Sequence, residues 1–202
     1  MTLRLGVLVS GRGTNLQALL DACGQGESAR PGEARLDGRV VLAVANRAGI
    51  PALERAERAG VPTRTFVAGD HGGREPAQRA MAEALVAARC GLVVLAGFDQ
   101  VLADGFFAAL GGIPVINVHP ALLPAFGGVG MIGERVHAAV LASGARESGC
   151  TVHRVGPGPI DGGEIVLQRR VPVLAGDDVG SLAARVLVEE HTALVEAVRQ
   201  LE

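Results

Sequence analysis

The 202-residue chain contains no lysine, tryptophan or tyrosine, and phenylalanine, with five copies, is its only large aromatic residue. The absence of lysine excludes a Walker-type phosphate loop, a Schiff base and a pyridoxal phosphate anchor, which all depend on that side chain. Five phenylalanines are too few for the stacking surface that binds single-stranded nucleic acid. Nineteen basic and 21 acidic residues give a net charge of −2. We therefore expect no nucleic-acid partner.

Cysteines and long apolar runs are also scarce. Cys23, Cys90 and Cys150 form no CxxC pair, and the five histidines show no metal-ligand spacing, so we expect no metal. The longest apolar runs are about six residues, far below the roughly 20 that cross a bilayer. The first strand candidate lacks the apolar core and cleavage site of a secretory signal. We expect a cytoplasmic protein with no membrane partner.

Short runs of branched apolar residues alternate with segments of helical period over the first 120 residues. This alternation predicts repeated βαβ units around a parallel sheet. The expected strands are 3–9, 39–45, 63–67, 92–96 and 115–118. The expected helices are 15–23, 52–59 and 74–88.

The pattern changes after residue 134. One helix to residue 143 precedes two strand candidates, 148–155 and 164–173, with no helix between them, and a helix over 178–201 follows. Strands joined without a helix favour an antiparallel end of the sheet. We therefore predict a single α/β domain over 1–202, a Rossmann-like open and mostly parallel sheet with helices on both faces and antiparallel strands in its C-terminal part. The polar segment 24–38 is predicted to be a solvated loop.

The first candidate site is Ser10-Gly-Arg-Gly-Thr-Asn15, at the end of the first strand. Its glycines allow a sharp turn, and the following helix directs unpaired N–H groups and a positive dipole at a ligand. Thr14 and Gln17 have the spacing of a capping box. Leu16 replaces the third glycine of the dinucleotide fingerprint, which favours a lone phosphate group over a nicotinamide cofactor. A tight turn without a ligand is the alternative interpretation.

The second candidate site joins two strand residues and a later loop. Asn117 and His119 lie two apart, so they share one face at the carboxyl end of a strand, where open parallel sheets bind ligands. Asp161 lies in the Gly156–Gly163 segment, whose composition is also that of an ordinary turn. If Asp161 meets His119, its carboxylate favours the imidazolium form of that ring.

Taken together, the chain resembles the glycinamide branch of the formyltransferase family. The motifs that carry this resemblance, in the family's order and spacing, are Ser10-Gly-Arg-Gly-Thr-Asn15, Leu95-Ala-Gly-Phe98, Asn117-Val-His-Pro-Ala-Leu-Leu-Pro124, Cys150-Thr-Val-His153, Asp161-Gly-Gly-Glu-Ile-Val-Leu-Gln168 and Glu189-Glu190-His191. The resemblance implies transfer of a formyl group from 10-formyltetrahydrofolate to the amine of N1-(5-phospho-D-ribosyl)glycinamide, a step of de novo purine synthesis.

The resemblance also assigns site residues. It implies that the phosphoribosylglycinamide substrate is bound by Gly13, Thr14, Asn15 and Glu190. It implies that the folate is bound by Arg74, Asp99, Gln100, Val101, Leu102 and Asn117. The catalytic set that it implies is Asn117, His119 and Asp161. These assignments involve small-molecule substrates and a folate co-substrate without a metal, in a monomer or a homodimer.

Two segments depart from the family's pattern. Asp99-Gln100 stands where the family commonly has Met-Arg, which removes a cation near the folate, and Phe126–Met131 lacks the proline and histidine of many members. Among sibling activities, a methionyl-tRNA formyltransferase would need a further RNA-binding domain and a basic surface. The remaining alternatives are a 10-formyltetrahydrofolate hydrolase and a noncatalytic phosphosugar-binding protein.

Overall fold

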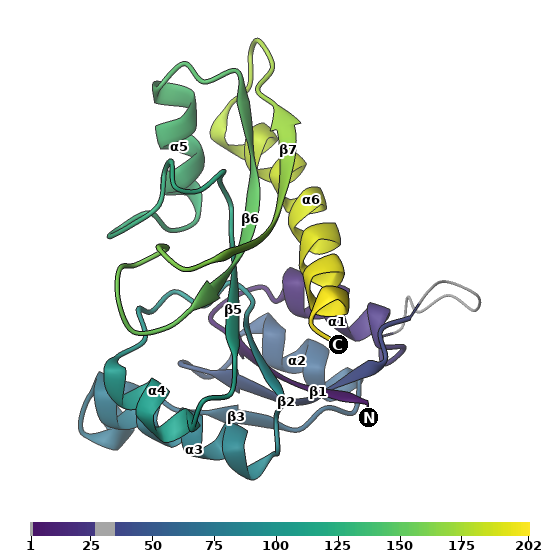
Figure 1. Ribbon diagram of the computed structural model, residues 1–202, viewed down its shortest axis with the longest axis vertical. Helices are drawn as coiled ribbons and strands as arrows, with labels where there is room; N and C mark the ends of the chain where they lie inside the picture. Colours follow the sequence, from purple (N-terminus) through teal and green to yellow (C-terminus); the bar gives the residue numbers. More distant parts are fainter. Residues whose placement is uncertain (1, 27–34) are drawn as a thin grey trace.

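A computed structural model describes residues 2–26 and 35–202, so residues 27–34 of the predicted solvated loop lie outside the described residues. The described chain forms a seven-stranded sheet in the order β3-β2-β1-β4-β5-β6-β7 (Figure 1). The strands are β1 (Leu3–Val9), β2 (Gly38–Ala45), β3 (Thr63–Thr65), β4 (Leu92–Leu95), β5 (Val115–His119), β6 (Glu147–Val155) and β7 (Ile165–Pro172). Strands β1 to β5 pair in parallel, and β6 and β7 pair antiparallel. The predicted mixed sheet is confirmed.

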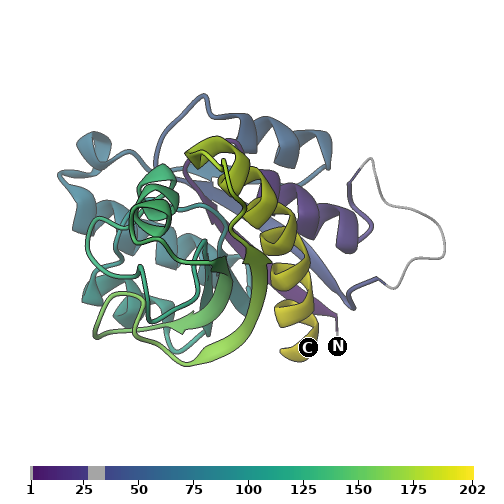
Figure 2. The ribbon, with the colours of Figure 1, turned by 90° about the horizontal axis from the view of Figure 1, so that it is seen from above.

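Helices cover both faces of the sheet, as predicted (Figure 2). They are α1 (Thr14–Ala22), α2 (Pro51–Arg58), α3 (Arg74–Ala87), α4 (Asp104–Leu110), α5 (Glu134–Ala142) and α6 (Val179–Gln200), with a 3-10 helix η1 at Ala68–His71. Helices α1, α2, α5 and α6 contribute to the apolar cluster on one face. Helices α3 and α4 form the cluster on the other face.

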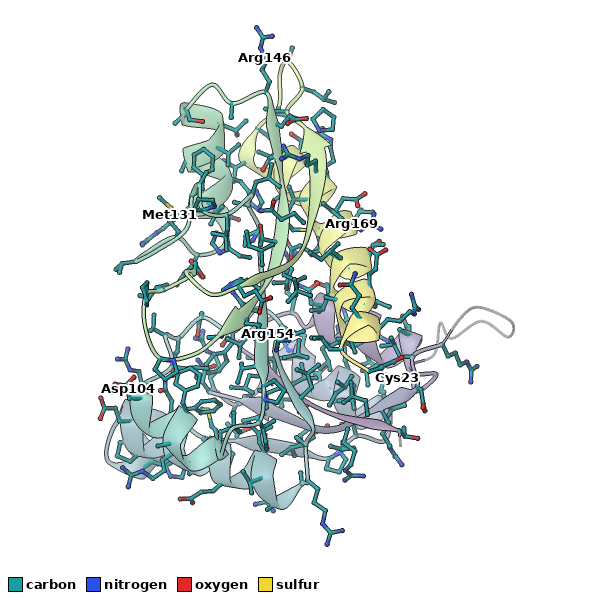
Figure 3. All side chains as sticks on the ribbon, viewed as in Figure 1. Cys23, Asp104, Met131, Arg146, Arg154 and Arg169 are labelled. Atoms are coloured by element: carbon teal, nitrogen blue, oxygen red, sulfur yellow. The ribbon has the colours of Figure 1, made fainter. Side chains whose placement is uncertain are left out.

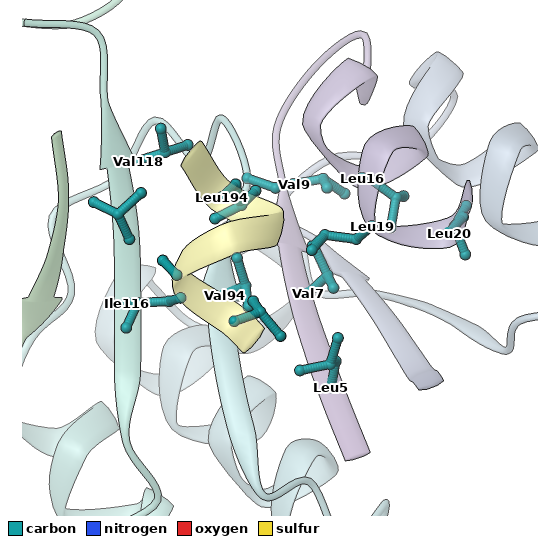
Figure 4. Packing of buried hydrophobic residues seen from close by; sticks show 14 of the residues in the cluster. Leu5, Val7, Val9, Leu16, Leu19, Leu20, Val94, Ile116, Val118 and Leu194 are labelled. Atoms are coloured by element: carbon teal, nitrogen blue, oxygen red, sulfur yellow. The ribbon is translucent and has the colours of Figure 1, made fainter. Parts of the chain in front are cut away.

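Strand β1 is buried between these two layers, which explains its unbroken apolar run. Leu5, Val7 and Val9 face the layer of α1 and α6, as Figure 4 shows, whereas Leu8 faces the layer of α3 and α4. Each of these four side chains is fully buried. Burying one such side chain contributes roughly 1.5–3 kcal/mol, so β1 is a rigid base for the loop that follows it.

Helix α4 lies between β4 and β5, where the sequence predicts no helix, so the prediction for this interval is wrong. The helix has only seven residues, and Gly105 in its first turn weakens its helical preference. Its signals are Phe106 and Leu110, which are four residues apart and buried, and Gly111, which ends the helix with a φ of 67°. Such a short helix depends on packing against α3 rather than on its own propensity.

The predicted capping box of Thr14 and Gln17 is also wrong. Helix α1 begins at Thr14, with Gly13 as its N-cap residue and no side-chain hydrogen bond to the cap. The Gln17 side chain instead donates to Asp21 and accepts from Arg55. Because no side chain covers the first turn, the N–H groups of α1 stay open to a ligand.

The order of the strands defines where a ligand can bind. β1 leads to β2 and β3 on one side of the sheet, whereas β4 and β5 lie on its other side. Such a reversal of strand order opens a crevice outside the carboxyl ends of the strands. The loops after β1, β4 and β5 all start at this crevice, so the fold brings the two candidate sites to one edge of the sheet.

The fold makes one prediction about pH and stability, at His191 of α6. Burial lowers the pKa of His191, and its Nε2 has no hydrogen-bond partner within the described residues. The unfolded chain therefore binds a proton near its ordinary pKa of about 6.5 that the folded chain does not bind. Stability is lost as the pH falls below about 6.5.

Replacing His191 by glutamine removes this titration without removing a hydrogen bond from Nε2. Urea unfolding at about pH 7.5 and about pH 5.5 is expected to show a larger loss of unfolding free energy in the natural chain than in His191→Gln. Equal losses in the two proteins would contradict the desolvation of this ring.

Candidate active site

The candidate site is a cleft of about 910 Å³ at the carboxyl ends of β1, β4 and β5. Its walls come from the loop after β1, from the β4–α4 loop (residues 96–103), from the loop between β6 and β7, and from α6. Three lining residues are labelled in Figure 3: Met131 lies above Asp104 in that view, and Arg154 lies to the right of both, at a height between them. This volume suits an organic ligand larger than a single phosphate group.

The loop after β1 approaches its neighbours so closely that Gly13 has no room for a side chain. Gly13 has a φ of 74°, and a Cβ atom there would lie 2.6 Å from Cβ and 2.7 Å from Cα of Ala52. The Arg12 carbonyl accepts a hydrogen bond of 3.0 Å from Arg55 Nε, which fixes the loop from α2. The loop is thus held as an open turn that leads directly into the uncapped start of α1, a geometry suited to an anion.

Asn15 and Glu190 form a buried polar pair at the floor of this part of the cleft. Asn15 Nδ2 donates to Glu190 Oε2 at 2.8 Å, and Glu190 is 8% exposed. Burial raises the pKa of Glu190, and the bond from Asn15 partly offsets that rise. Asn15 Oδ1 is buried without a partner within the described residues. A buried polar pair with unused capacity facing a cleft is available to bind hydroxyl or amine groups of a ligand.

His119 and Asp161 meet at the centre of the cleft. His119 Nδ1 lies 3.7 Å from Asp161 Oδ2, and the two side chains are 4% and 12% exposed. This distance is too long for a direct hydrogen bond but leaves the carboxylate facing the ring as a charge partner. His119 Nε2 donates to the Phe126 carbonyl at 2.8 Å, because a carbonyl oxygen can only accept.

The backbone conformation of Asp161 and a hydrogen bond to its carboxylate hold this side chain in place. Its φ is 56°, in the left-handed region, which asparagine and aspartate adopt more readily than most other residues. Its Oδ2 accepts a hydrogen bond of 2.9 Å from the Gly128 N–H. The β6–β7 loop and the segment after His119 are therefore joined at this carboxylate.

Asn117 is paired across the sheet with His153, a residue for which the sequence predicted no role. The two residues are direct partners in the antiparallel β5–β6 pairing, and Asn117 Nδ2 donates to His153 Nε2 at 3.2 Å. His153 Nδ1 donates to the Arg154 carbonyl at 3.0 Å, so the ring carries its proton on Nδ1. Burial lowers the pKa of His153 despite the nearby Asp161 carboxylate, which supports the neutral ring.

This pairing orients the carboxamide of Asn117. One N–H of Asn117 Nδ2 is held by His153, and the other is left for a ligand in the cleft. The sequence did place His153 on an expected antiparallel strand. Which residue of β5 it faces depends on the register between β5 and β6, and spacing along the chain does not give that register.

The β4–α4 loop turns its two unusual side chains toward the protein. The Asp99 carboxylate accepts hydrogen bonds from Asn46 and Arg47. Burial alone raises the pKa of Asp99, but hydrogen bonds from Asn46 and Ser10 and the charge of Arg47 outweigh it, so this pKa is lowered. Gln100 Oε1 accepts from Gln78 at 3.1 Å.

The structure brings together most of the residues that the sequence indicated. Those that line the cleft are Gly13, Thr14, Asn15, Asp99, Gln100, Val101, Leu102, Asn117, His119, Asp161 and Glu190. Arg74 does not line the cleft; it is the exposed first residue of α3. Within the described residues no group of three or more His, Cys, Asp or Glu side chains is arranged to hold a metal ion.

With this geometry established, comparison with known proteins defines the class. A profile of the formyl transferase family matches residues 3–198, and the chain belongs to that family. It is 37% identical over 185 residues to phosphoribosylglycinamide formyltransferase of Escherichia coli K12, covering 92% of this chain and 80% of that protein. A crystal structure of glycinamide ribonucleotide transformylase 1 from Symbiobacterium toebii has a TM-score of 0.88 and 41% identity, covering 99% of this chain and 87% of that one.

Longer relatives contain the same unit. The trifunctional purine biosynthetic protein adenosine-3 of Drosophila melanogaster is 39% identical over 198 residues, which are 98% of this chain but 14% of that protein. The chain spans 13% to 18% of the length of the trifunctional relatives that it matches. In the described part of the chain no helix is long and apolar enough to cross a membrane.

Proposed function

We propose that this chain is a phosphoribosylglycinamide formyltransferase, which moves a formyl group from 10-formyltetrahydrofolate to the amine of N1-(5-phospho-D-ribosyl)glycinamide in purine synthesis. One observation carries the proposal: Asn117, His119 and Asp161 meet in a cleft that has an open, anion-suited helix start at one end and the β4–α4 loop at the other. The names of the relatives in E. coli and S. toebii agree with it.

The two ends of the cleft suit the two substrates. The turn at Gly13 and the uncapped start of α1 suit the phosphate of the acceptor, and the buried pair of Asn15 and Glu190 suits its polar sugar or amine groups. The β4–α4 loop contributes Val101 and Leu102, and the facing loop contributes Ile160. Apolar walls with few polar anchors suit a flat pteridine-like ring.

The chemistry begins when the acceptor amine attacks the formyl carbon, which forms a C–N bond and a tetrahedral oxyanion. The free N–H of Asn117 and the Nε2–H of His119 donate hydrogen bonds to this oxygen. In the structure the His119 Nε2–H donates to the Phe126 carbonyl, so the oxyanion replaces that carbonyl as the acceptor. Loss of one such donor typically lowers the rate on the order of 100 to 1000-fold.

Proton transfer completes the reaction. Asp161 faces the His119 ring and accepts the proton of the attacking amine, directly or through water. The same proton passes to the departing N10 of the folate as the bond between N10 and the formyl carbon breaks, which leaves tetrahydrofolate and the formylated amine. His153 takes no proton in this scheme; it holds the Asn117 carboxamide in position.

A transfer assay tests the proposal. With both substrates, the account predicts equal amounts of tetrahydrofolate and formylated acceptor. With water or other amines in place of the acceptor, it predicts little turnover. Rapid formation of tetrahydrofolate without an acceptor would indicate a hydrolase, and binding of both ligands without turnover would indicate a noncatalytic phosphosugar-binding protein. Either result would contradict the proposal.

Replacing Gly13 by alanine is expected to raise KM for the acceptor at least tenfold. The new Cβ would lie within 2.7 Å of Ala52, and alanine disfavours a φ of 74°, so the loop must shift away from the phosphate position. Steady-state kinetics with varied acceptor measure the change.

Gly69→Ala is the matched control for this prediction, because Gly69 lies in η1 outside the cleft and a Cβ there would meet nothing within 4 Å. Its KM for the acceptor is expected to stay close to that of the natural chain. Equal KM values for the two variants would show that the close approach at Gly13 is unimportant for binding.

We also propose that residues 1–202 act as one catalytic domain in the reducing cytoplasm, as a monomer or a homodimer. Both apolar clusters pack on the same sheet, and the described walls of the cleft come from a single chain. Cys23, Cys90 and Cys150 are free thiols, which agrees with a reducing compartment. Burial raises their pKa values to about 11, about 11 and about 12.

A further inference from the structure

We propose that Gln78, a residue of α3 that does not line the cleft, is a positioning residue that holds the β4–α4 loop in the conformation that binds folate. This inference rests on the proposed function and adds a determinant of the affinity for the formyl donor. It assigns a role to a buried side chain that lies behind the loop rather than in contact with a ligand.

Each polar part of the Gln78 carboxamide is used by this loop. Nε2 donates to the Val101 carbonyl at 3.1 Å and to Gln100 Oε1 at 3.1 Å. Oε1 accepts from the Ala103 N–H at 2.8 Å. A primary amide has two N–H donors and one carbonyl oxygen, so the loop takes both donors and uses the oxygen as well.

The burial of this carboxamide points to a specific role. Gln78 is fully buried, and the other buried residues of α3 are all apolar: Ala77, Met81, Ala82 and Leu85. A buried amide is unfavourable unless it is hydrogen-bonded, and an apolar side chain would fill the same space without that penalty. The three hydrogen bonds to one loop therefore account for a polar residue in an otherwise apolar helix face.

The β4–α4 loop depends on the hydrogen bonds from Gln78 because the polar side chains of the loop, Asp99 and Gln100, bind other protein groups. The Asp99 carboxylate is bound by Asn46 and Arg47, and the Gln100 carbonyl is bound by Gln78. These bonds leave for a ligand the main chain, the Nε2 group of Gln100 and the apolar side chains of Val101, which is 46% exposed, and Leu102. Main-chain groups bind a ligand well only where the backbone is fixed. Gln78 fixes the backbone of the loop at the Val101 carbonyl and at the Ala103 N–H.

The same contacts account for the Asp99-Gln100 departure noted in the sequence. No cation is needed at Gln100 for the loop to keep its shape, because Gln78 binds the Gln100 side chain and the Val101 carbonyl with the same Nε2. We therefore expect the folate to be recognised through the shape of the loop rather than through a charged side chain at Gln100.

The test compares Gln78→Met with the natural chain. Methionine has a similar length and no donor, so it fills the space and removes all three hydrogen bonds. KM for 10-formyltetrahydrofolate is expected to rise roughly tenfold, the factor that corresponds to about 1.4 kcal/mol. KM for the acceptor and kcat are expected to stay within about threefold of the natural values. Gln78→Asn, which keeps the amide on a shorter stem, is expected to show the same selective rise if the methionine variant folds poorly.

Two control variants separate this role from general stability. Leu85→Val alters a buried side chain of the same helix that faces the sheet, and Arg79→Ala alters an exposed neighbour. Neither is expected to change the KM for folate. Hydrogen exchange supplies a readout without turnover: the Ala103 amide is expected to exchange faster in Gln78→Met than in the natural chain or in Leu85→Val.

The possible results lead to distinct conclusions. A rise in the KM for folate alone, with faster exchange at Ala103, supports the proposal. An unchanged KM for folate, an equal rise in both KM values, or the same rise in Leu85→Val overturns it. If the natural chain does not transfer formyl groups, the proposed function fails, and binding of a 10-formylfolate analogue and exchange at Ala103 still test the loop: unchanged binding and exchange in Gln78→Met overturn the role of Gln78.

Discussion

Replacing His119 by alanine is expected to lower kcat by a factor on the order of 1000. The ring is 4% exposed, its Nδ1 faces Asp161 at 3.7 Å, and its Nε2–H donates to the Phe126 carbonyl, so the substitution removes a hydrogen-bond donor from beside the Asp161 carboxylate. Stopped-flow or steady-state assays at saturating substrate measure the loss. The acceptor is expected to bind with nearly unchanged affinity, because the site that we propose for its phosphate is the loop after β1, away from His119.

His71→Ala is the control for this prediction. His71 is in η1, away from the cleft, so its removal tests whether loss of any histidine lowers the rate. Turnover by His71→Ala is expected to match that of the natural chain. Near-normal turnover by His119→Ala would defeat the role assigned to His119, and loss of acceptor binding in that variant would show that the two ends of the cleft are not independent.

Replacing Asp161 by asparagine is expected to lower kcat at least 100-fold. Asparagine suits this site because it tolerates the φ of 56° and can still accept the hydrogen bond from Gly128. The substitution therefore removes the negative charge beside His119 and His153 while keeping the loop in place. The loss of rate then reports the carboxylate itself.

Glu147→Gln is the matched control, since it removes one negative charge from an exposed pair with Arg170 at the far end of β6. Its kcat is expected to stay normal. Thermal unfolding of both variants checks that the fold is kept. If Asp161→Asn turns over at the natural rate, Asp161 neither moves the proton nor assists His119 through its charge.

Much of the fold was predictable from the sequence because its central strands, β1 and β4, are buried on both faces. Strand β1 reads as a continuous apolar run, and the change of pattern after residue 134 indicated the antiparallel end that β6 and β7 form. Helix α4 was missed because a seven-residue helix with an early glycine owes its existence to packing on α3. The supposed cap of α1 failed because Gln17 has better partners in Asp21 and Arg55.

The candidate site was predictable where it depends on local geometry. Asn117 and His119 share a face because of strand period, and the turn at Gly13 follows from its glycines. The role of His153 depends on the register between β5 and β6, and the contact of Asp161 with His119 depends on the path of the β6–β7 loop. Neither register nor loop path is fixed by spacing along the chain.

The sequence could not predict the hydrogen-bond partners of the β4–α4 loop either. Asn46 and Gln78 are 53 and 22 residues from the loop side chains that they bind, Asp99 and Gln100. From the sequence, Asp99-Gln100 could be interpreted only as the loss of a cation relative to the family's pattern. The structure shows instead that both side chains have protein partners, a result that requires the positions of β2 and α3 relative to β4.

The most direct test of the account is the kcat of the double variant His119→Ala with Asp161→Asn. If the two residues act on one charge and one proton path, their effects are not additive, and the double variant is expected to turn over about as slowly as His119→Ala alone. A double variant whose loss equals the product of the two single losses would contradict the account, because the ring and the carboxylate would then act independently.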